Sequence, residues 1–167
     1  MKNVYFLFIM LFLAAFLSGQ ASIFDLSFGA TREESIATLE EQGFRISLDY
    51  GYSLYLVPIE GDTLNGVEVD LMFLDTEDIL SDWLIRFPVR DNPDLEANLW
   101  QALTDLHGPG STTDDANQEH REGTWILGGK HILTAKYDSG TGFLWLNYET
   151  ERDYSNDEDD EDEYWGF

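Results

Sequence analysis

The chain has 167 residues, no cysteine, and 33 acidic against 9 basic side chains, which give a formal net charge of −24. A surface of this charge repels nucleic-acid phosphates and anionic lipids, so the composition argues against binding to nucleic acid or to a membrane surface. It favours a basic protein partner, or serves simply to keep the protein soluble. Without cysteine the fold contains no disulfide and depends on its apolar core. The length is that of a single domain.

The first 21 residues have the pattern of a cleavable secretory signal. Lys2 precedes an apolar run over residues 4–17, which is shorter than the roughly 20 residues that cross a membrane as a helix. Gly19 and Ala21 are small residues at the spacing expected before a cleavage site, so we expect Ser22 to begin the mature protein. An uncleaved anchor helix is the alternative. No cysteine follows the run, which excludes a lipoprotein anchor.

The compartment follows from what an exported chain of this kind lacks. It has neither cysteines for disulfides nor an Asn-x-Ser/Thr glycan acceptor, and this combination fits a bacterial envelope better than a eukaryotic secretory route. The sequence therefore predicts a periplasmic or secreted protein, with no stable membrane insertion once the signal is removed.

The first helix signal lies at Thr31, whose side chain can cap a helix, and Glu34 is placed to complete a capping box. Ile36 and Leu39 form a narrow apolar stripe, and Gly43 is suited to end the helix because glycine adopts the left-handed conformation without steric cost. The pattern predicts a helix of about three turns. An extended stretch follows.

Strands are predicted over residues 53–59, 66–74 and 83–87, because apolar and polar side chains alternate there with the period of a half-buried strand. In the third of these, Trp83 lies on one face and Arg86 on the other. The Asn65-Gly66 dipeptide is favoured in tight hairpins, so the first two strands are expected to be antiparallel neighbours.

The second helix is the best-marked element. Asn92 can cap it and Pro93 suits its first position. Leu99 and Leu103 are its predicted core residues, and Gly108 begins the Gly-Pro-Gly segment that ends it. The whole apolar stripe comprises Leu95, Leu99, Ala102, Leu103 and Leu106.

After this helix we expect a polar, mobile loop over residues 111–122. Further strands are predicted over residues 124–127, 131–137 and 143–148, with Gly128-Gly129 making the first turn between them. Residues 149–167 are predicted to be a disordered acidic tail, since closely spaced like charges repel one another and bury nothing.

Residues 28–87 and 92–148 share an order of elements: a helix, a glycine stop, and at least three consecutive strands. A helix with an antiparallel meander cannot bury its sheet face alone, so two such pseudo-repeats are expected to share one sheet. We therefore predict one α+β domain over residues 22–148, with both helices on the same side of the sheet.

Residues 28–34, which read Phe-Gly-Ala-Thr-Arg-Glu-Glu, open a helix with a glycine stop and a strand meander. This order resembles the helix-first repeat of the bacterial envelope superfamily that contains the lipoprotein SmpA/BamE and the tandem-repeat β-lactamase inhibitor protein. The resemblance covers residues 28–148 as an order of elements. It implies protein–protein binding in the envelope, but transfers no functional residue. The lipobox cysteine and the inhibitor's disulfide cysteines are absent.

Little in the sequence points to catalysis or to a cofactor. His107, His120 and His131 are the only histidines, and none has a second ligand at the spacing of a metal site, so no metal is predicted. His107 is expected at the end of the second helix, where an imidazolium or a hydrogen bond to the last carbonyls is an ordinary structural use. No thiol exists, and no serine lies in a Gly-x-Ser-x-Gly pattern.

Acidic pairs keep one enzymatic alternative open. Asp114 with Asp115, or Asp75 with Asp78, could supply the acid and base of glycoside hydrolysis. Such pairs also arise by chance among 33 acids. A small exported hydrolase that uses paired carboxylates is therefore the alternative function.

Candidate partner-binding residues are aromatic. Trp145 and Tyr148 lie on opposite faces of the last predicted strand, and an exposed one would suit partner recognition because large rings give contact area at small entropic cost. Burial of both is the alternative. Tyr164, Trp165 and Phe167 follow seven consecutive acids and could anchor this acidic tail on a basic-rimmed apolar pocket of a partner. The alternative is a solubilising tail whose aromatic side chains pack on the protein's own surface. The leading function is a non-catalytic, exported, protein-binding or inhibitor-like module.

Overall fold

The computed structural model describes residues 22–61, 64–74, 77–114 and 120–150. The predicted signal segment and the tail beyond residue 150 lie outside these ranges. The elements are a short 3-10 turn η1 (Ile23–Asp25), helices α2 (Arg32–Glu41) and α3 (Pro93–His107), and strands β1 (Phe44–Asp49), β2 (Ser53–Pro58), β3 (Glu68–Leu74), β4 (Ile79–Pro88), β5 (Ser111–Asp114), β6 (His120–Leu127), β7 (His131–Asp138) and β8 (Phe143–Thr150).

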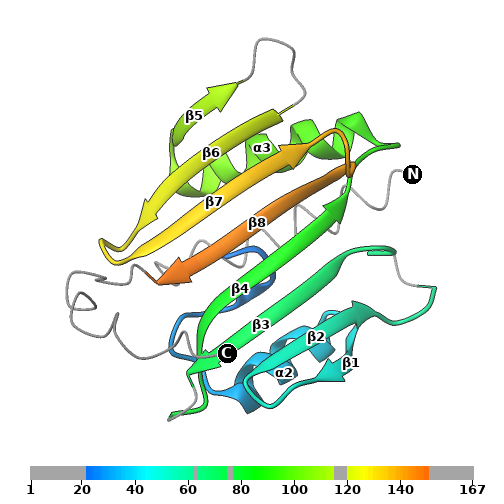
Figure 1. The fold of residues 1–167 in the computed structure, drawn as a ribbon, viewed down its shortest axis with the longest axis vertical. Coiled ribbons are helices and arrows are strands. Elements are labelled where there is room, and N and C mark those ends of the chain that lie inside the picture. Colours follow the sequence, from blue (N-terminus) through cyan, green and yellow to red (C-terminus); the bar gives the residue numbers. More distant parts are fainter. Residues whose placement is uncertain (1–21, 62–63, 75–76, 115–119, 151–167) are drawn as a thin grey trace, which may run out of the picture.

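The strands form one sheet of eight, in the order β1-β2-β3-β4-β8-β7-β6-β5 (Figure 1). Every neighbouring pair is antiparallel. β4 and β8 meet at the centre, and β1 and β5 are the two edge strands. The α+β class predicted from the sequence is confirmed.

Helix α2 begins as the sequence predicts. The Thr31 hydroxyl accepts the Glu34 backbone N–H at 3.2 Å, and the Glu34 carboxylate accepts the Thr31 backbone N–H at 2.9 Å. This reciprocal pair is a capping box, which satisfies two of the donors that a helix start leaves free. Gly43 follows the helix with φ of 88°, a conformation that disfavours other residues.

Helix α3 also begins and ends as predicted. The Asn92 side chain accepts the Leu95 backbone N–H at 3.1 Å, and Pro93 occupies the first turn. Leu99 and Leu103 are fully buried, which confirms the two predicted core positions. Trp100 is buried beside them and was not expected from the leucine stripe.

Strand β4 begins four residues before its predicted start at Trp83. Two polar residues, Ser81 and Asp82, lie in this first part and are buried. The Ser81 hydroxyl is 2.7 Å from the Asp82 carboxylate, which also accepts the Thr150 backbone N–H at 3.1 Å. Ser81 and Asp82 are polar, and they can be buried because they are hydrogen-bonded. The alternation of apolar and polar residues therefore did not extend over them, and the prediction missed the start of β4.

The predicted mobile loop over residues 111–122 is wrong at both of its ends. Residues 111–114 form the edge strand β5, and β6 begins at His120, with Ser111 opposite Thr124 and Asp114 opposite Arg121. Residues 115–119 lie outside the described part of the chain. Edge strands face solvent, so a polar segment can form one without the apolar alternation on which the prediction depended.

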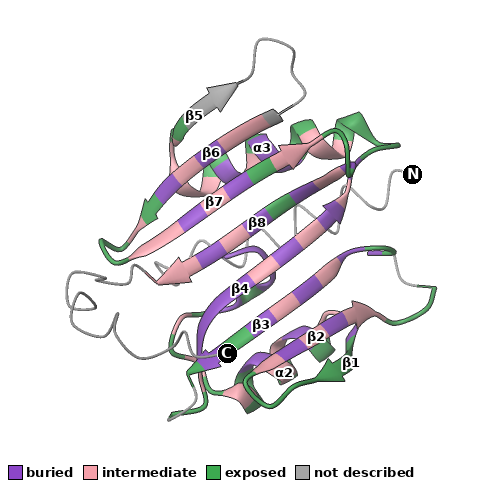
Figure 2. Ribbon diagram, viewed as in Figure 1, coloured by how far each residue is buried: buried purple, intermediate pink, exposed green. Residues whose placement is uncertain are grey.

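Buried residues alternate with less buried ones along the strands (Figure 2). Because successive side chains of a strand point to opposite faces, the buried ones form a core on one face of the sheet. The Trp83 and Tyr148 rings stack at 4.8 Å in its centre, and the Tyr148 hydroxyl lies 3.4 Å from the Ile23 backbone nitrogen that donates to it. Burial raises the pKa of Tyr148 well above its usual value. One row across the sheet comprises Leu54, Leu71, Trp83, Tyr148, Leu133 and Trp125.

Within the described ranges, neither helix has the length and apolar character needed to cross a membrane.

Candidate functional site

The face of the sheet opposite the core, called the open face below, carries a row of five side chains. They stand directly opposite one another on consecutive strands, and side chains alternate between the two faces of a strand, so all five project away from the core. Across β3, β4, β8, β7 and β6 the row reads Glu68, Arg86, Trp145, Lys136 and Glu122.

The row is symmetric in charge about its central tryptophan. Trp145 is 37% exposed and stands between Arg86 and Lys136, with Glu68 and Glu122 at the two ends. A partly exposed indole beside a guanidinium is a combination enriched in the centres of protein interfaces. The arrangement is suited to recognition of a surface.

Arg86 organises one side of the row. Its Nε lies 3.1 Å from a Glu68 carboxylate oxygen, its second terminal nitrogen pairs with Asp70, and its guanidinium lies over the Tyr55 ring, 5.7 Å from the centroid. These three charged side chains are each about one quarter to one third exposed. Two carboxylates therefore share a single guanidinium, and the cluster keeps an excess negative charge.

Partial burial changes the proton affinities of this cluster. It raises the pKa of Asp70, an effect that Arg86 opposes and Glu68 reinforces. The pKa of Tyr55 is raised as well, first by burial and then by a hydrogen bond with Glu68. Tyr55 therefore stays a neutral phenol beside the acids at neutral pH.

The structure separates the aromatic residues that the sequence nominated. Trp145 lies on the open face, whereas Tyr148 is fully buried and belongs to the core. Tyr164, Trp165 and Phe167 lie outside the described residues, so their docking role stays a prediction.

Sequence reasoning placed Arg86 on the face of its strand opposite Trp83, which the structure confirms. It did not bring Arg86, Trp145 and Lys136 together. The alternation of residues within a strand predicts which face of that strand each side chain occupies. It does not predict the order in which the strands pair, and that order brings these three residues together.

The histidines have structural surroundings. His107 ends α3, and burial lowers its pKa to about 4, so it is neutral at physiological pH. The His131 ring stacks on Phe28 with centroids 3.7 Å apart, and its Nδ1 lies 3.3 Å from the Thr150 hydroxyl. Its pKa is lowered, first by burial and then by Lys130, against the opposing effect of Asp82. In the described ranges no three metal-ligating side chains gather into a group.

The acidic pairs weighed for hydrolysis are incomplete in the described chain, because Asp75 and Asp115 lie outside it. Asp78 belongs to a different network, 3.9 Å from the Arg32 guanidinium. No facing pair of carboxylates is therefore assembled from these candidates within the described ranges.

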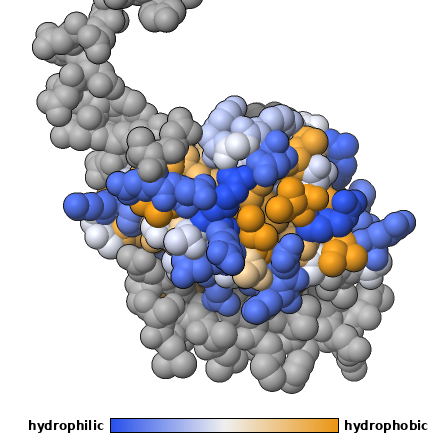
Figure 3. Space-filling view, turned by 90° about the horizontal axis from the view of Figure 1, so that it is seen from below, coloured by the Kyte–Doolittle hydropathy of each residue, from blue (hydrophilic) through white to orange (hydrophobic). Residues whose placement is uncertain are grey.

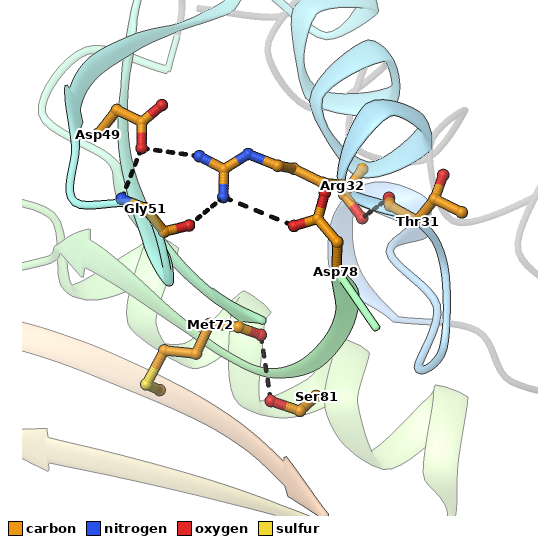
Figure 4. A network of polar contacts seen from close by, with 8 residues as sticks. Thr31, Arg32, Asp49, Gly51, Met72, Asp78 and Ser81 are labelled. Carbon is orange, nitrogen blue, oxygen red and sulfur yellow. Dashed lines mark hydrogen bonds and ion pairs between the residues drawn. The ribbon is translucent and has the colours of Figure 1, made fainter. Parts of the chain in front are cut away.

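That network surrounds Arg32 at the start of α2 (Figure 4). Its guanidinium pairs with Asp49 at 2.7 Å and donates to the Gly51 carbonyl, and it lies over the Phe73 ring. The pKa of Asp49 is lowered, first by the hydrogen bond from the Gly51 N–H and then by Arg32. The contacts tie the β1–β2 turn to the helix, so we interpret this cluster as structural.

Neither a protein-family model, nor a curated protein, nor a solved structure matches this chain.

Proposed function

We propose that this protein is a non-catalytic, exported binding module of the bacterial envelope that contacts another protein through its open face. The observation that carries the proposal is the row centred on Trp145, in which a partly exposed indole stands between two cations and two acids. Residues of these types, placed on rigid strands, give contact area and orientation without ordering a loop. The sequence resemblance to an envelope superfamily of binding proteins points the same way.

The proposed architecture is a pair of pseudo-repeats that share one sheet and leave its other face to the partner. Each of the two runs of four strands follows one helix in the chain, and the runs meet at β4 and β8. Figure 1 draws both helices behind the strands, which supports the placement of α2 and α3 on the core side. On this proposal the row on the open face lies where the two repeats join.

The partner is proposed to be basic. The chain carries a net charge of −24, so long-range attraction favours a cationic surface and speeds its approach. Near the row, the excess negative charge of Glu68, Asp70 and Arg86 gives a cation of the partner a local site of attraction. Added salt is then expected to weaken the complex because it screens these charges.

The experiment compares three forms of the protein as bait in an envelope extract. We expect Trp145→Ala to recover at least one partner about tenfold less well than the wild type, the loss typical of a central interface aromatic. The matched control is Tyr52→Ala, which removes an aromatic side chain that is 61% exposed and lies in the β1–β2 turn, outside the row. Equal recovery by Trp145→Ala and wild type would refute the open face as the binding site.

The same assay tests the predicted tail anchor. A chain without residues 164–167 should fold normally and recover less of the same partner, if the terminal aromatics dock as proposed. Recovery equal to that of the full chain would remove the tail from the proposal and leave the open face in place. No contact among the described residues favours the alternative hydrolase.

A further inference from the structure

The first residues of the predicted mature chain lie inside the core. Ser22, Ile23 and Phe24 are 5%, 6% and 4% exposed, and they directly follow the bond at which we expect the signal to be cut. Leu26 is buried as well. Other apolar side chains of this protein reach the surface, as the end of the molecule drawn in Figure 3 shows, but those of this segment do not. We call residues 22–26 the N-terminal plug.

Aromatic packing holds the plug against the sheet. The Phe24 ring meets the Phe44 ring edge-on with centroids 5.1 Å apart, and it is stacked on the Phe87 ring at 6.1 Å. Phe44 lies in β1 and Phe87 in β4, and both are buried. Because a protein core is closely packed, Phe24 can leave this place only when the core around it opens.

Hydrogen bonds also tie the plug to distant parts of the chain. The Ile23 backbone N–H donates to the Tyr148 hydroxyl of β8 at 3.4 Å, and the Gln42 side-chain amide, at the end of α2, donates to the Phe24 carbonyl at 2.8 Å. The Ser22 hydroxyl donates to a carbonyl within the plug at 2.6 Å. The chain on the far side of the expected cleavage site is therefore engaged in the fold from its first residues.

The backbone of the plug is not extended. Phe24 and Asp25 have φ of 71° and 56°, in the left-handed region that residues other than glycine rarely adopt. Such a conformation persists where the surrounding structure imposes it. The plug therefore takes this shape on the assembled sheet, and a free chain of the same sequence has no reason to hold it.

We propose that the bond between Ala21 and Ser22 is hydrolysed before the plug docks, and that docking then closes the cleavage site. The inference rests on the export included in the proposed function. A signal peptidase, which recognises small residues before the bond, adds water across it and leaves a carboxylate on Ala21 and an ammonium group on Ser22. Proteolysis requires an accessible chain on both sides of the bond, and the docked plug withholds residues 22–26.

The order of cleavage and folding then decides which form of the protein results. A chain that is cut first is released as the mature domain. A chain that folds first keeps residues 1–21 joined to a plug that the peptidase cannot enter, and its apolar run over residues 4–17 is left as an anchor. The cleaved signal and the uncleaved anchor are thus two outcomes of one competition.

The test compares two states of the full-length precursor as substrates of a bacterial signal peptidase in detergent. One sample is added directly from urea, so that cleavage competes with folding, and the other is refolded first. Mass spectrometry of the products measures cleavage after Ala21. We expect the refolded precursor to be cut at least about tenfold more slowly, because only chains whose plug is transiently open can be cut.

The two ways in which this test can fail are distinguishable. Equal rates for the two samples would overturn the proposed order of events and leave the export of the protein in place. Cleavage of neither sample would overturn that order and also remove the signal, and with it the exported location in the proposed function. Binding at the open face is measured in a separate assay and does not depend on either result.

Gln42→Ala tests whether the plug itself closes the site. It removes the hydrogen bond to the Phe24 carbonyl without changing the sequence around the cleavage site, so the plug should open more often. We expect the refolded variant to be cut about fivefold faster than the refolded wild type, the effect of losing one hydrogen bond. The matched control is Gln101→Ala, which removes an exposed side chain that bonds Asp105 on α3 and should leave the rate unchanged. An unchanged rate for Gln42→Ala would overturn the role of the plug.

Hydrogen exchange on the refolded wild-type precursor gives a measurement that needs neither a variant nor the peptidase. The backbone amides of Ile23 and Asp25 donate to the Tyr148 hydroxyl and the Ser22 carbonyl, so we expect both amides to be protected. Exchange of these two amides at the rate of an unstructured peptide would show that the plug is not docked in the precursor, and the proposal would then be wrong.

Discussion

The two helices of this protein are held against the sheet by different means. Helix α2 buries Leu39 and Ser35, and polar contacts at its first turn hold it in place. Helix α3 buries Leu99, Trp100 and Leu103. One helix therefore depends mainly on the geometry of its start, and the other on the apolar surface along its length.

Aromatic packing attaches α3 to β6. Trp100 lies against Trp125, with ring centroids 6.2 Å apart, and the Arg121 guanidinium covers the Trp100 ring at 4.3 Å. The Trp125 indole N–H donates to the Gly108 carbonyl at the helix end. Gly123 provides the space, because a Cβ there would come within 2.8 Å of the Trp100 ring. The two parts of the chain share the order of a helix followed by four strands. In one of them, buried apolar side chains hold the helix α3, and in the other, polar contacts hold the helix α2.

The largest expected effect is at the centre of α3. Leu99 is 1% exposed, so Leu99→Ala should lower the free energy of unfolding by about 2 to 5 kcal/mol through lost burial and a residual cavity. Urea denaturation followed by circular dichroism measures it. Asn98→Ala, an exposed neighbour on the same helix, is the control and should change stability by less than about 0.5 kcal/mol. An equally small change in the free energy of unfolding for Leu99→Ala would contradict the claim that buried apolar side chains hold this helix against the sheet.

The sequence predicted both helices because their signals are local. Each helix start is indicated by two residues that lie close together in the sequence: Thr31 and Glu34 for α2, and Asn92 and Pro93 for α3. The structure confirms both starts. Trp100 was missed because a leucine stripe at helical spacing already accounted for the buried face. Its burial depends on Gly123, which lies 23 positions further along the chain and leaves room for its ring.

The site was less accessible to sequence reasoning than the fold. Alternation placed Trp145 and Arg86 on definite faces of their own strands. Their alignment with Lys136 requires that β4 pair with β8, which brings together Arg86 and Trp145 from 59 positions apart in the chain. Pairing over such a distance depends on how the strands pack together. Long-range register of this kind leaves no mark in a short window of sequence.

A smaller effect is expected from pH at the end of α3. Burial lowers the pKa of His107 to about 4, below the value of 6.5 that it has when unfolded. The unfolded state therefore binds the proton more readily, so the contribution of His107 to the free energy of unfolding is constant above pH 6.5 and falls as the pH drops towards 4. Because the side chain is partly exposed, we expect about 1 to 2 kcal/mol of loss from this group.

The variant His107→Gln isolates this effect from the titration of the many acids. Urea denaturation of both proteins at pH 7 and pH 4.5 gives the comparison, in which the wild type should lose more stability than the variant. Equal losses would mean that His107 is protonated as easily in the folded state as in the unfolded one. The His107 side chain would then be exposed to solvent, and the buried apolar contacts of α3 would end before this residue.

The smallest global effect is expected at the start of α2. The Arg32 side chain is 18% exposed, but its partners Asp49 and Asp78 are 54% and 66% exposed, and ion pairs with exposed partners contribute about 0.2 to 1 kcal/mol. Asp49 also keeps the Gly51 N–H, 2.8 Å away, when Arg32 is removed. We therefore expect Arg32→Ala to lower the free energy of unfolding by about 1 kcal/mol or less.

The local effect of Arg32→Ala should be larger than the global one. Its guanidinium joins the helix start to the β1–β2 turn, so hydrogen exchange at residues 49–55 should accelerate while α3 keeps its protection. Arg45→Ala, which removes an exposed arginine from β1, is the matched control and should leave exchange in dilute solution unchanged. A global loss above about 2 kcal/mol, or uniform acceleration, would show that this polar cluster stabilises the whole fold as the apolar contacts of α3 do.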